Sequence, residues 1–379
     1  GGGAIRLLSS APLVVASRTF NDAAAGTFGQ YIPGAPASSA VPGGAETRLI
    51  GLDQTGAFRT NLGLANTSGA YAPVEIELVD AAGATVGTRT ETLSPYGWLQ
   101  VNEIFRRQGV TGIESGSAIV RNLADQAAVL AYGSVVDDAT GDPVYVTPVT
   151  PAVPGDPVRI AAAAHGNGVG GSVWRTDVDL LNPGASPVEA ILELFPAGSA
   201  APPPSVRAML PAGSARRLDD VVSEQFGRSG AGSIRVSVAG EGAVMVTSRT
   251  YNQAATGTFG QFIPAVPESM ALVQGVRAAL VQLRQNDGFR TNLGFVNLAD
   301  NAVRITVDMF DGRGGVLGTV LYDLPAGGYF QANQPLPEGT DSGFVVVSST
   351  TEEARFLAYA SVVDRGSDDP VFMPASPVD

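Results

Sequence analysis

A chain of 379 residues has room for roughly two to four domains. Its formal net charge of −13, without any cluster of basic residues, makes nucleic acid and anionic lipid surfaces poor partners. The chain has no Cys, which excludes disulfides, thiolate metal sites and Cys nucleophiles, and no Lys, which excludes isopeptide crosslinks and Schiff-base chemistry. No apolar run approaches the ~20 residues of a transmembrane helix, so membrane insertion is not expected. The 47 Gly and 26 Pro, scattered among short apolar runs, predict an all-β protein with many turns.

The first recognisable feature is the motif SRTFNDAAAGTFGQYIP at residues 17–33. It returns as SRTYNQAATGTFGQFIP at residues 248–264, with thirteen of seventeen positions identical and an offset of 231 residues. In the second copy the motif ends a repeated module and leads into a Pro-rich linker. We therefore interpret it as a closing β-hairpin, a piece of architecture used twice, with its Gly residues at turns and its Phe and Ile residues packing at a core or junction.

Residues 1–42 are predicted to be only the second half of a type A β-sandwich module. The segment that precedes the second copy of the motif, from WRTDV to DDVV, has no counterpart before the first copy. The opening GGGAIRLLSS lacks the charged and apolar regions of a signal peptide, so a mature product or a fragment is expected.

A half sandwich would expose unpaired strand edges and an apolar face. Two explanations stay open: the sequence begins partway through a longer protein, or another subunit supplies the missing strands. The last module is complete, which argues against simple exchange of a half module between identical chains.

The next predicted unit is a type B β-sandwich module at residues 45–151. Its segment VEIELVD alternates apolar and acidic residues, as a half-buried strand does. In FRTNLGL one face carries Phe58, Thr60, Leu62 and Leu64, and the other carries Arg and Asn. The segment NEIFRRQGVTG is predicted to form a short helical turn.

A type A module is predicted at residues 157–267, after the Pro-rich linker TPAVPGD. It opens with Trp174-Arg175-Thr176-Asp177 and contains SIRVSVAG, an alternating strand, and DVVSEQFGRSG, a short helical turn. His165, the only histidine, lies in a Gly-rich loop before Trp174. With no Cys and no second His, zinc and Ser/His/Asp chemistry have little support, and we interpret His165 as a loop residue.

A second type B module is predicted at residues 275–379. GFRTNLGFVN repeats GAFRTNLGLAN at an offset of 231, and AYASVVDRGSDDPVFMP repeats AYGSVVDDATGDPVYVTP at an offset of 227. Both B modules carry an acidic loop, formed by Asp137, Asp138 and Asp142 in the first and by Asp364, Asp368 and Asp369 in the second. These loops are weak Ca²⁺ candidates, because Ca²⁺ takes several carboxylate and carbonyl oxygens, but the spacing is not that of an EF-hand. An Asp-rich turn is the favoured interpretation.

Each complete module also has an Arg two positions before an Asn or Asp on one strand face, and each hairpin motif has one Arg. Two interpretations are open. These residues form a row of ligand-binding groups, or they have a structural role in which Arg bonds carbonyls or carboxylates across strands. A residue pattern that occurs once per module favours the structural role. The residues are Arg18, Arg59, Asn61, Arg175, Asp177, Arg249, Arg290 and Asn292.

About seven short strands in roughly 110 residues predict a sandwich of immunoglobulin-like size for each module. The stretches Trp174 to Pro183 (WRTDVDLLNP) and Ser248 to Gln261 (SRTYNQAATGTFGQ) resemble repeats of large, mostly uncharacterised exported proteins. The chain thus resembles tandem immunoglobulin-like β-sandwich modules of secreted bacterial surface proteins. The resemblance implies export and a surface role, and it carries no known activity. With the Pro-rich linkers, it leads us to expect a beads-on-a-string rod.

The function expected from the sequence is that of a non-enzymatic extracellular or cell-surface structural protein, a subunit or segment of a filament or sheath, assembled with neighbouring copies by strand complementation. The alternative is an adhesin or carbohydrate-binding region of a larger secreted protein, with a glycan as partner. No catalytic residue, cofactor site or metal site stands out, apart from the weak Ca²⁺ candidates.

Overall fold

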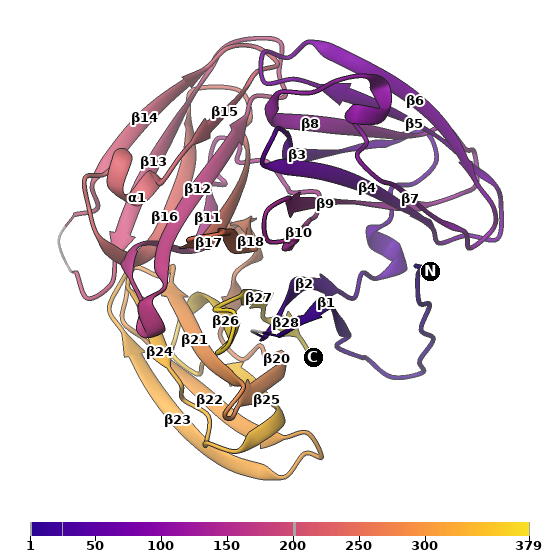
Figure 1. Cartoon of the computed structure of the whole chain (residues 1–379). Coiled ribbons are helices and arrows are strands. Elements are labelled where there is room, and N and C mark those ends of the chain that lie inside the picture. The colour runs from indigo at the N-terminus through magenta and orange to yellow at the C-terminus, as the bar shows by residue number, and fades with distance from the viewer. Residues whose placement is uncertain (1, 25, 200–201, 379) are drawn as a thin grey trace.

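The structure is a computed structural model that describes residues 2–24, 26–199 and 202–378 (Figure 1). Several antiparallel sheets in β-sandwich-like layers make up the fold, which confirms the all-β prediction. We keep the predicted module ranges as names for parts of the chain: the A half-module (1–42), the first B module (45–151), the A module (157–267) and the second B module (275–379).

The A half-module contributes one hairpin. Its strands are β1 (Ala16–Ala23) and β2 (Gly26–Pro33), paired antiparallel and followed by the 3-10 turn η1 (Ala37–Ser39). Residues 2–15 form no strand.

The first B module is a two-sheet sandwich. One sheet has the order β3 (Glu46–Gln54), β8 (Ile113–Asn122), β5 (Ala72–Val79) and β6 (Thr85–Leu93). The other has the order β10 (Pro143–Val146), β9 (Val129–Asp137), β4 (Phe58–Asn66) and β7 (Trp98–Val101). The first, third, fourth and sixth strands thus share a sheet, whereas the antibody-type sandwich separates ABED from CFG. The predicted helical turn is the 3-10 turn η2 (Arg106–Gln108).

The A module forms one continuous sheet that folds back on itself. Its order is β14 (Ser205–Leu210), β13 (Val188–Pro196), β16 (Gly230–Ala239), β11 (Val158–Asn167), β18 (Gly257–Pro267), β17 (Met245–Ala254), β12 (Val173–Leu181) and β15 (Ala215–Leu218). Strand β11 pairs with β16 and β18, and its last residues also pair with β12. This additional pairing connects the two halves of the folded sheet. The second predicted helical turn is α1 (Val221–Glu224), and η3 (Val169–Gly171) and η4 (Glu268–Met270) lie in connections.

The second B module repeats the sandwich of the first. One sheet runs β23 (Val316–Leu324), β22 (Val303–Asp311), β25 (Thr340–Ser348), β20 (Ala278–Gln285) and β28 (Ser376–Pro377). The other runs β19 (Leu272–Val273), β26 (Arg355–Asp364), β21 (Phe289–Asn297) and β24 (Tyr329–Asn333), and β27 (Pro370–Pro374) pairs with β26.

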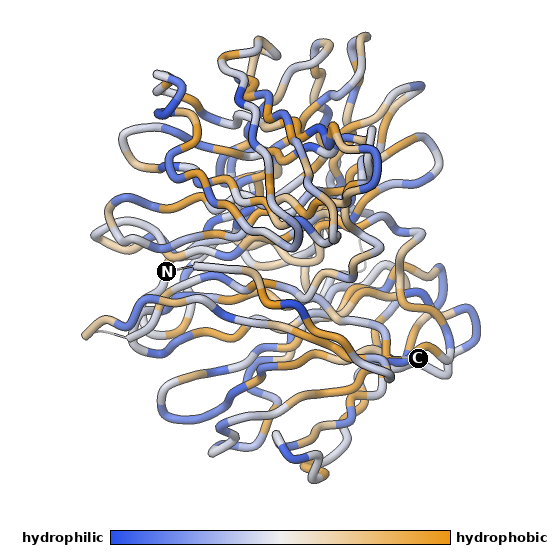
Figure 2. The backbone as a smooth tube through the Cα atoms, turned by 90° about the vertical axis from the view of Figure 1, so that its right-hand side faces the viewer, coloured by the Kyte–Doolittle hydropathy of each residue, from blue (hydrophilic) through white to orange (hydrophobic). Residues whose placement is uncertain are grey.

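The alternating segments form the strands that their period predicts. In β5 the side chains of Val74, Ile76 and Leu78 are fully buried, and the intervening glutamates face outward. Figure 2 shows apolar and polar positions mixed along the backbone throughout the molecule. Within the described ranges no helix is long and apolar enough to cross a membrane.

The expected beads-on-a-string rod is wrong. Strand β2 packs against β10 and β27, and β18 packs against the same two strands, so four strands from four parts of the chain meet at a common hub (Figure 1). The Pro-rich linkers do not act as spacers, because they are bonded to the modules: Val41 bridges Val129, and Ala152 bridges Val244. The apolar core of the A module also continues into the second B module through Val296 and Tyr329.

Candidate functional site at the hub

The repeated motif docks on the acidic loop of a B module. In the A module, the backbone N–H and the hydroxyl of Thr258 both donate to Asp137 Oδ2, at 2.9 and 2.6 Å. The N–H of Gly260 donates to Asp142 Oδ2 at 2.7 Å. In return, the hydroxyl of Thr140 donates to the carbonyl of Thr258 at 2.9 Å. The loop of the first B module is therefore a receptor for the hairpin at residues 248–264.

The hairpin of the A half-module docks on the second B module in the same way. The N–H and hydroxyl of Thr27 donate to Asp364 Oδ2 at 2.8 and 2.7 Å, and the N–H of Gly29 donates to Asp369 Oδ2 at 2.9 Å. The hydroxyl of Ser367 donates to the carbonyl of Thr27 at 2.6 Å. Each contact has its counterpart in the other joint, so the hub has an internal twofold repeat.

One glutamine of each hairpin reaches the opposite B module. Ser134 of the first B module donates to Gln30 Oε1 at 3.0 Å, and Ser361 of the second donates to Gln261 Oε1 at 3.0 Å. Each hairpin thus binds one B module through its Thr and Gly and the other through its Gln. The two hairpins and the two B modules alternate around the hub.

Two of the predicted repeat arginines stiffen these hairpins. Arg18 donates to the hydroxyl of Thr27 at 2.8 Å and forms an ion pair with Asp369 at 3.0 Å. Arg249 donates to the hydroxyl of Thr258 at 2.6 Å. Each guanidinium also lies over a Phe of the B module that its hairpin contacts, Arg18 over Phe289 and Arg249 over Phe58, at 5.9 and 5.3 Å from the ring centres.

The hairpins need glycine where they meet the loops. Gly26 and Gly257 have φ of +137° and +143°, a region that disfavours any side chain. A Cβ at Gly26 would lie 2.4 Å from Asp364 Oδ1, and one at Gly257 would lie 3.0 Å from Asp137 Oδ1. The motif therefore requires glycine at the point where the backbone presents its N–H groups to the carboxylates.

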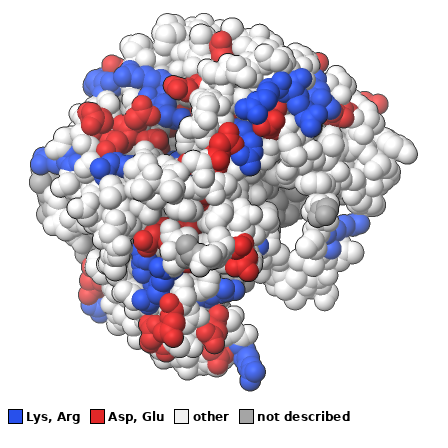
Figure 3. All heavy atoms as spheres, viewed as in Figure 1, with Lys and Arg blue, Asp and Glu red and all other residues white. Residues whose placement is uncertain are grey.

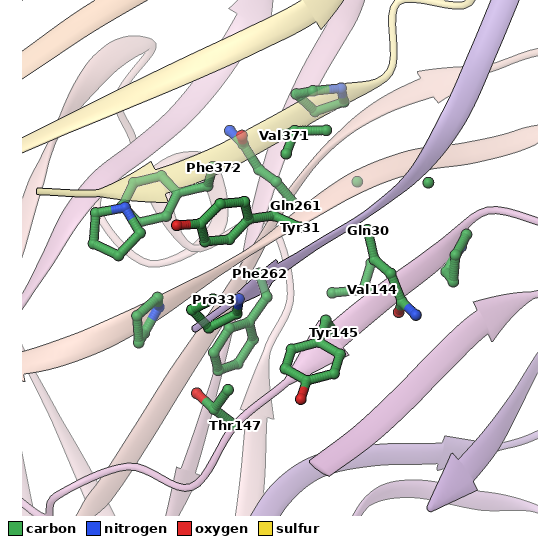
Figure 4. Close-up of a pocket in the computed structure, with 16 residues that line it drawn as sticks. Gln30, Tyr31, Pro33, Val144, Tyr145, Thr147, Gln261, Phe262, Val371 and Phe372 are labelled. Carbon is green, nitrogen blue, oxygen red and sulfur yellow. The ribbon is translucent and has the colours of Figure 1, made fainter. Parts of the chain in front are cut away.

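At its centre the hub encloses a cavity of about 120 Å³. Each of the four strands contributes one aromatic ring at the same position of its motif, and Figure 4 shows the rings of Tyr31, Tyr145, Phe262 and Phe372 around this space. Prolines of all four strands complete the lining. The cavity is thus an apolar packing centre, too small for most ligands.

Asp142 and Asp369, the carboxyls that accept the Gly N–H groups of the hairpins, have raised pKa values. Burial raises the pKa of Asp142 to about 7, against the opposing hydrogen bond from Gly260. Burial and the charge of Asp142 raise the pKa of Asp369 as well. For Asp137 and Asp364 burial acts in the same direction, but hydrogen bonds from Thr258 and Thr27 outweigh it and lower the pKa.

The acidic loops therefore bind protein groups. The middle aspartate of each loop pairs with the predicted arginine of its own module: Asp138 with Arg59, and Asp368 with Arg290 at 3.4 Å. The described residues contain no group of three or more His, Cys, Asp or Glu placed to hold a metal ion. Ca²⁺ binding stays a prediction without geometric support.

The remaining predicted residues also contact protein groups, with one exception. Arg175 pairs with Asp220 at 3.1 Å, and Asp177 accepts the N–H of Asp220 at 2.9 Å. Asn61 accepts the N–H of Glu103 at 3.0 Å. Asn292 instead lines a cleft between the A module and the second B module, described below. Arg175, Asp177 and Asn61 thus bond to groups of the chain itself.

His165 is placed differently from the expected loop position. It lies in strand β11, and its Nδ1 is 2.8 Å from Asp220 Oδ2. Among the described residues no Cys or second His joins this pair. The His165 side chain lines the same cleft as Asn292.

Sequence reasoning missed the joint between the first B module and the A module. Arg217 reaches Asp53 of the B module at 2.8 Å and Asp179 of its own module at 3.0 Å. Ser115 adds a hydrogen bond to Asp179 at 2.5 Å. Both carboxylates are nearly inaccessible, at 6% and 8% side-chain exposure. Arg217 has no repeated counterpart, so nothing in the sequence singled it out.

The outer surface is mixed in charge. On the face seen in Figure 3, arginines and acidic residues lie side by side, and wide areas between them carry no charge. Arg121, for example, contacts Glu46, Glu75 and Glu77 together. This face has no basic track that could follow a polyanion.

Comparisons with known proteins identify no family. No protein-family model and no curated protein matches the chain. Among solved structures, the chain is weakly similar to a GH78 family rhamnosidase of Bacillus sp. GL1, at 11% identity and a TM-score of 0.15, over 87% of this chain and 55% of that one. It is similar in the same weak way to an alpha-L-rhamnosidase of Streptomyces avermitilis complexed with L-rhamnose, at 10% identity and a TM-score of 0.17, over 95% of this chain and 40% of that one. The chain therefore spans only about half of each of these two proteins. TM-scores this low carry no argument about fold or activity.

Proposed function

We propose that the protein is a non-enzymatic structural protein of the extracellular space or cell surface. It is built from β-sandwich modules that are joined by docked hairpins, and it assembles with neighbouring molecules through the free edge of β1. One observation carries the proposal: the hairpins at 17–33 and 248–264 make the same docking contacts, but within the described residues only the second has a strand on its outer edge.

That difference lies in the pairing of β1 and β17. In the A module β17 lies between β18 and β12, with pairs from Trp174–Asn252 to Leu181–Met245. In the described part of the chain β1 pairs with β2 alone. The Ala16 carbonyl of this edge accepts the Gln282 side-chain amide at 2.8 Å. The rest of such an edge presents backbone N–H and C=O groups without a neighbouring strand, a template for an added strand.

Apolar side chains of the A half-module are exposed in β1 and in the segment before it. Ile5 and Leu8 are 86% and 81% exposed, and Leu13 and Phe20 are 61% and 53% exposed. In the A module the corresponding stretch, GSIRVSV, lies in β16 between β11 and β13. Exposed apolar side chains in and before a strand with an open edge are typical of a surface that a partner covers.

A folded neighbouring molecule cannot pair its β4, β12 or β21 with the open edge of β1. Strands β4, β12 and β21 each lie between two neighbours in their sheets. We therefore expect a neighbouring molecule to contribute one of its edge strands, which gives a chain of contacts between different surfaces and hence an open filament. The resemblance to immunoglobulin-like modules of secreted bacterial surface proteins supports the extracellular placement.

Sedimentation velocity and electron microscopy of the intact chain test this proposal. We expect oligomers or filaments, which Phe20→Lys should abolish by placing a charge beside the β1 edge. Tyr71→Lys is the matched control, because Tyr71 is 67% exposed in the connection between β4 and β5, outside the hairpin. Strictly monomeric behaviour of the unmodified chain would overturn the assembly function. Oligomers that persist in Phe20→Lys would overturn the role of β1.

A further inference from the structure

The A module and the second B module enclose a cleft of about 530 Å³. One wall consists of residues 162–169 with Trp174, and the other carries Arg290, Asn292 and the amides of β24. The two walls are held together by a shared apolar core that includes Ala163, Tyr329 and Tyr359. A preformed cleft of this volume lies in the range typical of small-ligand sites. We propose that it binds a neutral saccharide, a function that goes beyond the structural one and does not depend on it.

The wall of the second B module is an organised set of side-chain amides. Asn292 and Asn333 are direct partners in the β21–β24 ladder. Gln331 Nε2 donates to Asn333 Oδ1 at 3.0 Å, and Tyr359 donates to Gln331 Oε1 at 3.0 Å. The Tyr359 hydroxyl lies 2.8 Å from that of Tyr329, and both rings are buried. Two buried tyrosines therefore hold Gln331 in place, and Gln331 in turn orients Asn333.

Hydrogen-bonding groups remain for a ligand. Within the ranges that the structure describes, the side chain of Asn292 and the Nδ2 group of Asn333 have no protein partner. A side-chain amide donates at nitrogen and accepts at oxygen. This pairing suits a ligand rich in hydroxyl groups, since each hydroxyl also donates and accepts.

The charged groups at the cleft are already compensated. Arg290 is 7% exposed and pairs with Asp368 at 3.4 Å. His165 lies 2.8 Å from Asp220. An anionic ligand would have to compete with these carboxylates, whereas a neutral polyhydroxylated ligand would not. The compensation favours a saccharide without acidic groups.

The opposite wall contains an aromatic side chain. Trp174 is partly exposed in β12 and lines the cleft. Gly168 brings the loop close to the indole edge, because a Cβ there would lie 2.3 Å from Trp174 Nε1. Indole rings combine a large apolar face with one N–H donor, and the C–H face of a sugar ring can pack against them.

The first B module provides a natural comparison. It has the same amide wall: Gln100 Nε2 donates to Asn102 Oδ1 at 2.8 Å, and Tyr132 donates to Gln100 Oε1 at 2.9 Å. Within the described chain the A half-module has no strand equivalent to β12, so no counterpart of Trp174 lies opposite this second wall. The indole present there, Trp98, belongs to strand β7 of the wall itself and bonds Tyr132. Asn102 therefore serves as a control residue with the same local bonding outside the cleft.

A glycan array tests the proposal, with the full chain applied to neutral oligosaccharides and to uronate- and sialate-containing ones. Calorimetry with the bound neutral glycan then compares variants. We expect Asn333→Ala to weaken binding by about tenfold, Trp174→Ala to weaken it further, Trp174→Phe to restore part of the loss, and Asn102→Ala to have no effect. Circular dichroism checks the fold of each variant.

Three results would overturn the inference: no neutral glycan bound at millimolar concentration, binding confined to acidic glycans, or neutral binding unchanged in both Asn333→Ala and Trp174→Ala. Equal loss in Asn102→Ala would also overturn it, because the amide wall would then act through stability alone.

Discussion

Arg18 and Asp369 lie 351 positions apart in the sequence, yet their Nη2 and Oδ2 atoms are 3.0 Å apart and the Asp369 side chain has no exposed area. The pair fastens the hairpin of the A half-module to the last module. In its counterpart hairpin at 248–264, strand β17 is paired with β12. Arg249 donates to the Thr258 hydroxyl there, but among the described residues it forms no ion pair with Asp142 within 4.0 Å. The first hairpin thus depends on its docking contacts, and the second is held by its own module as well.

Arg18→Met should therefore loosen the first hairpin selectively. It removes a charge-assisted hydrogen bond from a buried carboxylate, a loss of about 1.5–3 kcal/mol. We expect backbone amides in residues 17–33 to exchange with deuterium about tenfold faster or more, as measured by mass spectrometry. Arg249→Met is the matched control, with a smaller change in residues 248–264. Equal acceleration in the two hairpins would contradict this account of the hub.

The hub carboxyls predict an unusual dependence of stability on pH. The pKa of Asp142 is raised to about 7 in the folded state, above the ordinary value of about 3.9 expected when unfolded. The folded state then binds more protons than the unfolded state between these values. The free energy of unfolding must therefore fall as pH rises from about 4 to 7, by up to about 1.4 kcal/mol per pH unit for each such group.

Asp142→Asn should remove the part of this slope that belongs to Asp142, since Asn keeps an acceptor for the Gly260 N–H but does not ionise. Urea unfolding at several pH values measures the slope. A residual slope is expected from Asp177, whose pKa burial raises to about 6, and from Asp369. A slope unchanged by Asp142→Asn would mean that Asp142 is ionised throughout this range.

The joint at Arg217 should be highly sensitive to the loss of its arginine. Arg217→Met leaves Asp53 and Asp179 buried without their cation, and removing one partner of a buried pair costs about 3–5 kcal/mol. Urea unfolding should show this loss at pH 7. Adding Asp53→Asn and Asp179→Asn should recover much of it. Failure of the triple variant to recover stability would show that Arg217 acts mainly through packing.

The sequence predicted local structure much better than contacts. Alternation in VEIELVD correctly predicted β5, and the repeated motif correctly predicted the hairpins β1–β2 and β17–β18. The receptor of each hairpin lies more than a hundred positions away, as with Thr258 and Asp137, and no local pattern encodes such a pairing. The rod was wrong for the same reason: Pro-rich segments read as spacers, but Val41 and Ala152 pair with strands of the modules.

One class of contact was present in the repeats and still went unrecognised. Gly63 faces Tyr132 across β4 and β9, and Gly294 faces Tyr359 across β21 and β26. Each tyrosine ring lies over its glycine and reaches on to a glutamine amide, Gln100 or Gln331. The sequence shows both residues in each repeat, but only the register of the sheet shows that they are opposite each other.

Gly294→Ala should disrupt this arrangement strongly. A Cβ at Gly294 would lie 1.9 Å from Tyr359 Cζ, and Tyr359 is only 1% exposed, so the ring has nowhere to go. Overpacking of a closed core costs about 1–3 kcal/mol, and occasionally more. Displacement of the ring would also break its 3.0 Å hydrogen bond to Gln331. We expect a lower urea midpoint and an altered near-ultraviolet circular dichroism spectrum.

Gly63→Ala is the matched control, because the same Cβ would lie 2.0 Å from Tyr132 Cζ in a less enclosed setting. Tyr132 is only half-buried and stacks on Tyr145, with ring centres 4.8 Å apart, so it can turn outward at lower cost. Tyr359→Leu added to Gly294→Ala should recover part of the lost stability, since the smaller side chain vacates the space that the new methyl group needs. If Gly63→Ala cost as much as Gly294→Ala, burial of the tyrosine would not be what sets the penalty.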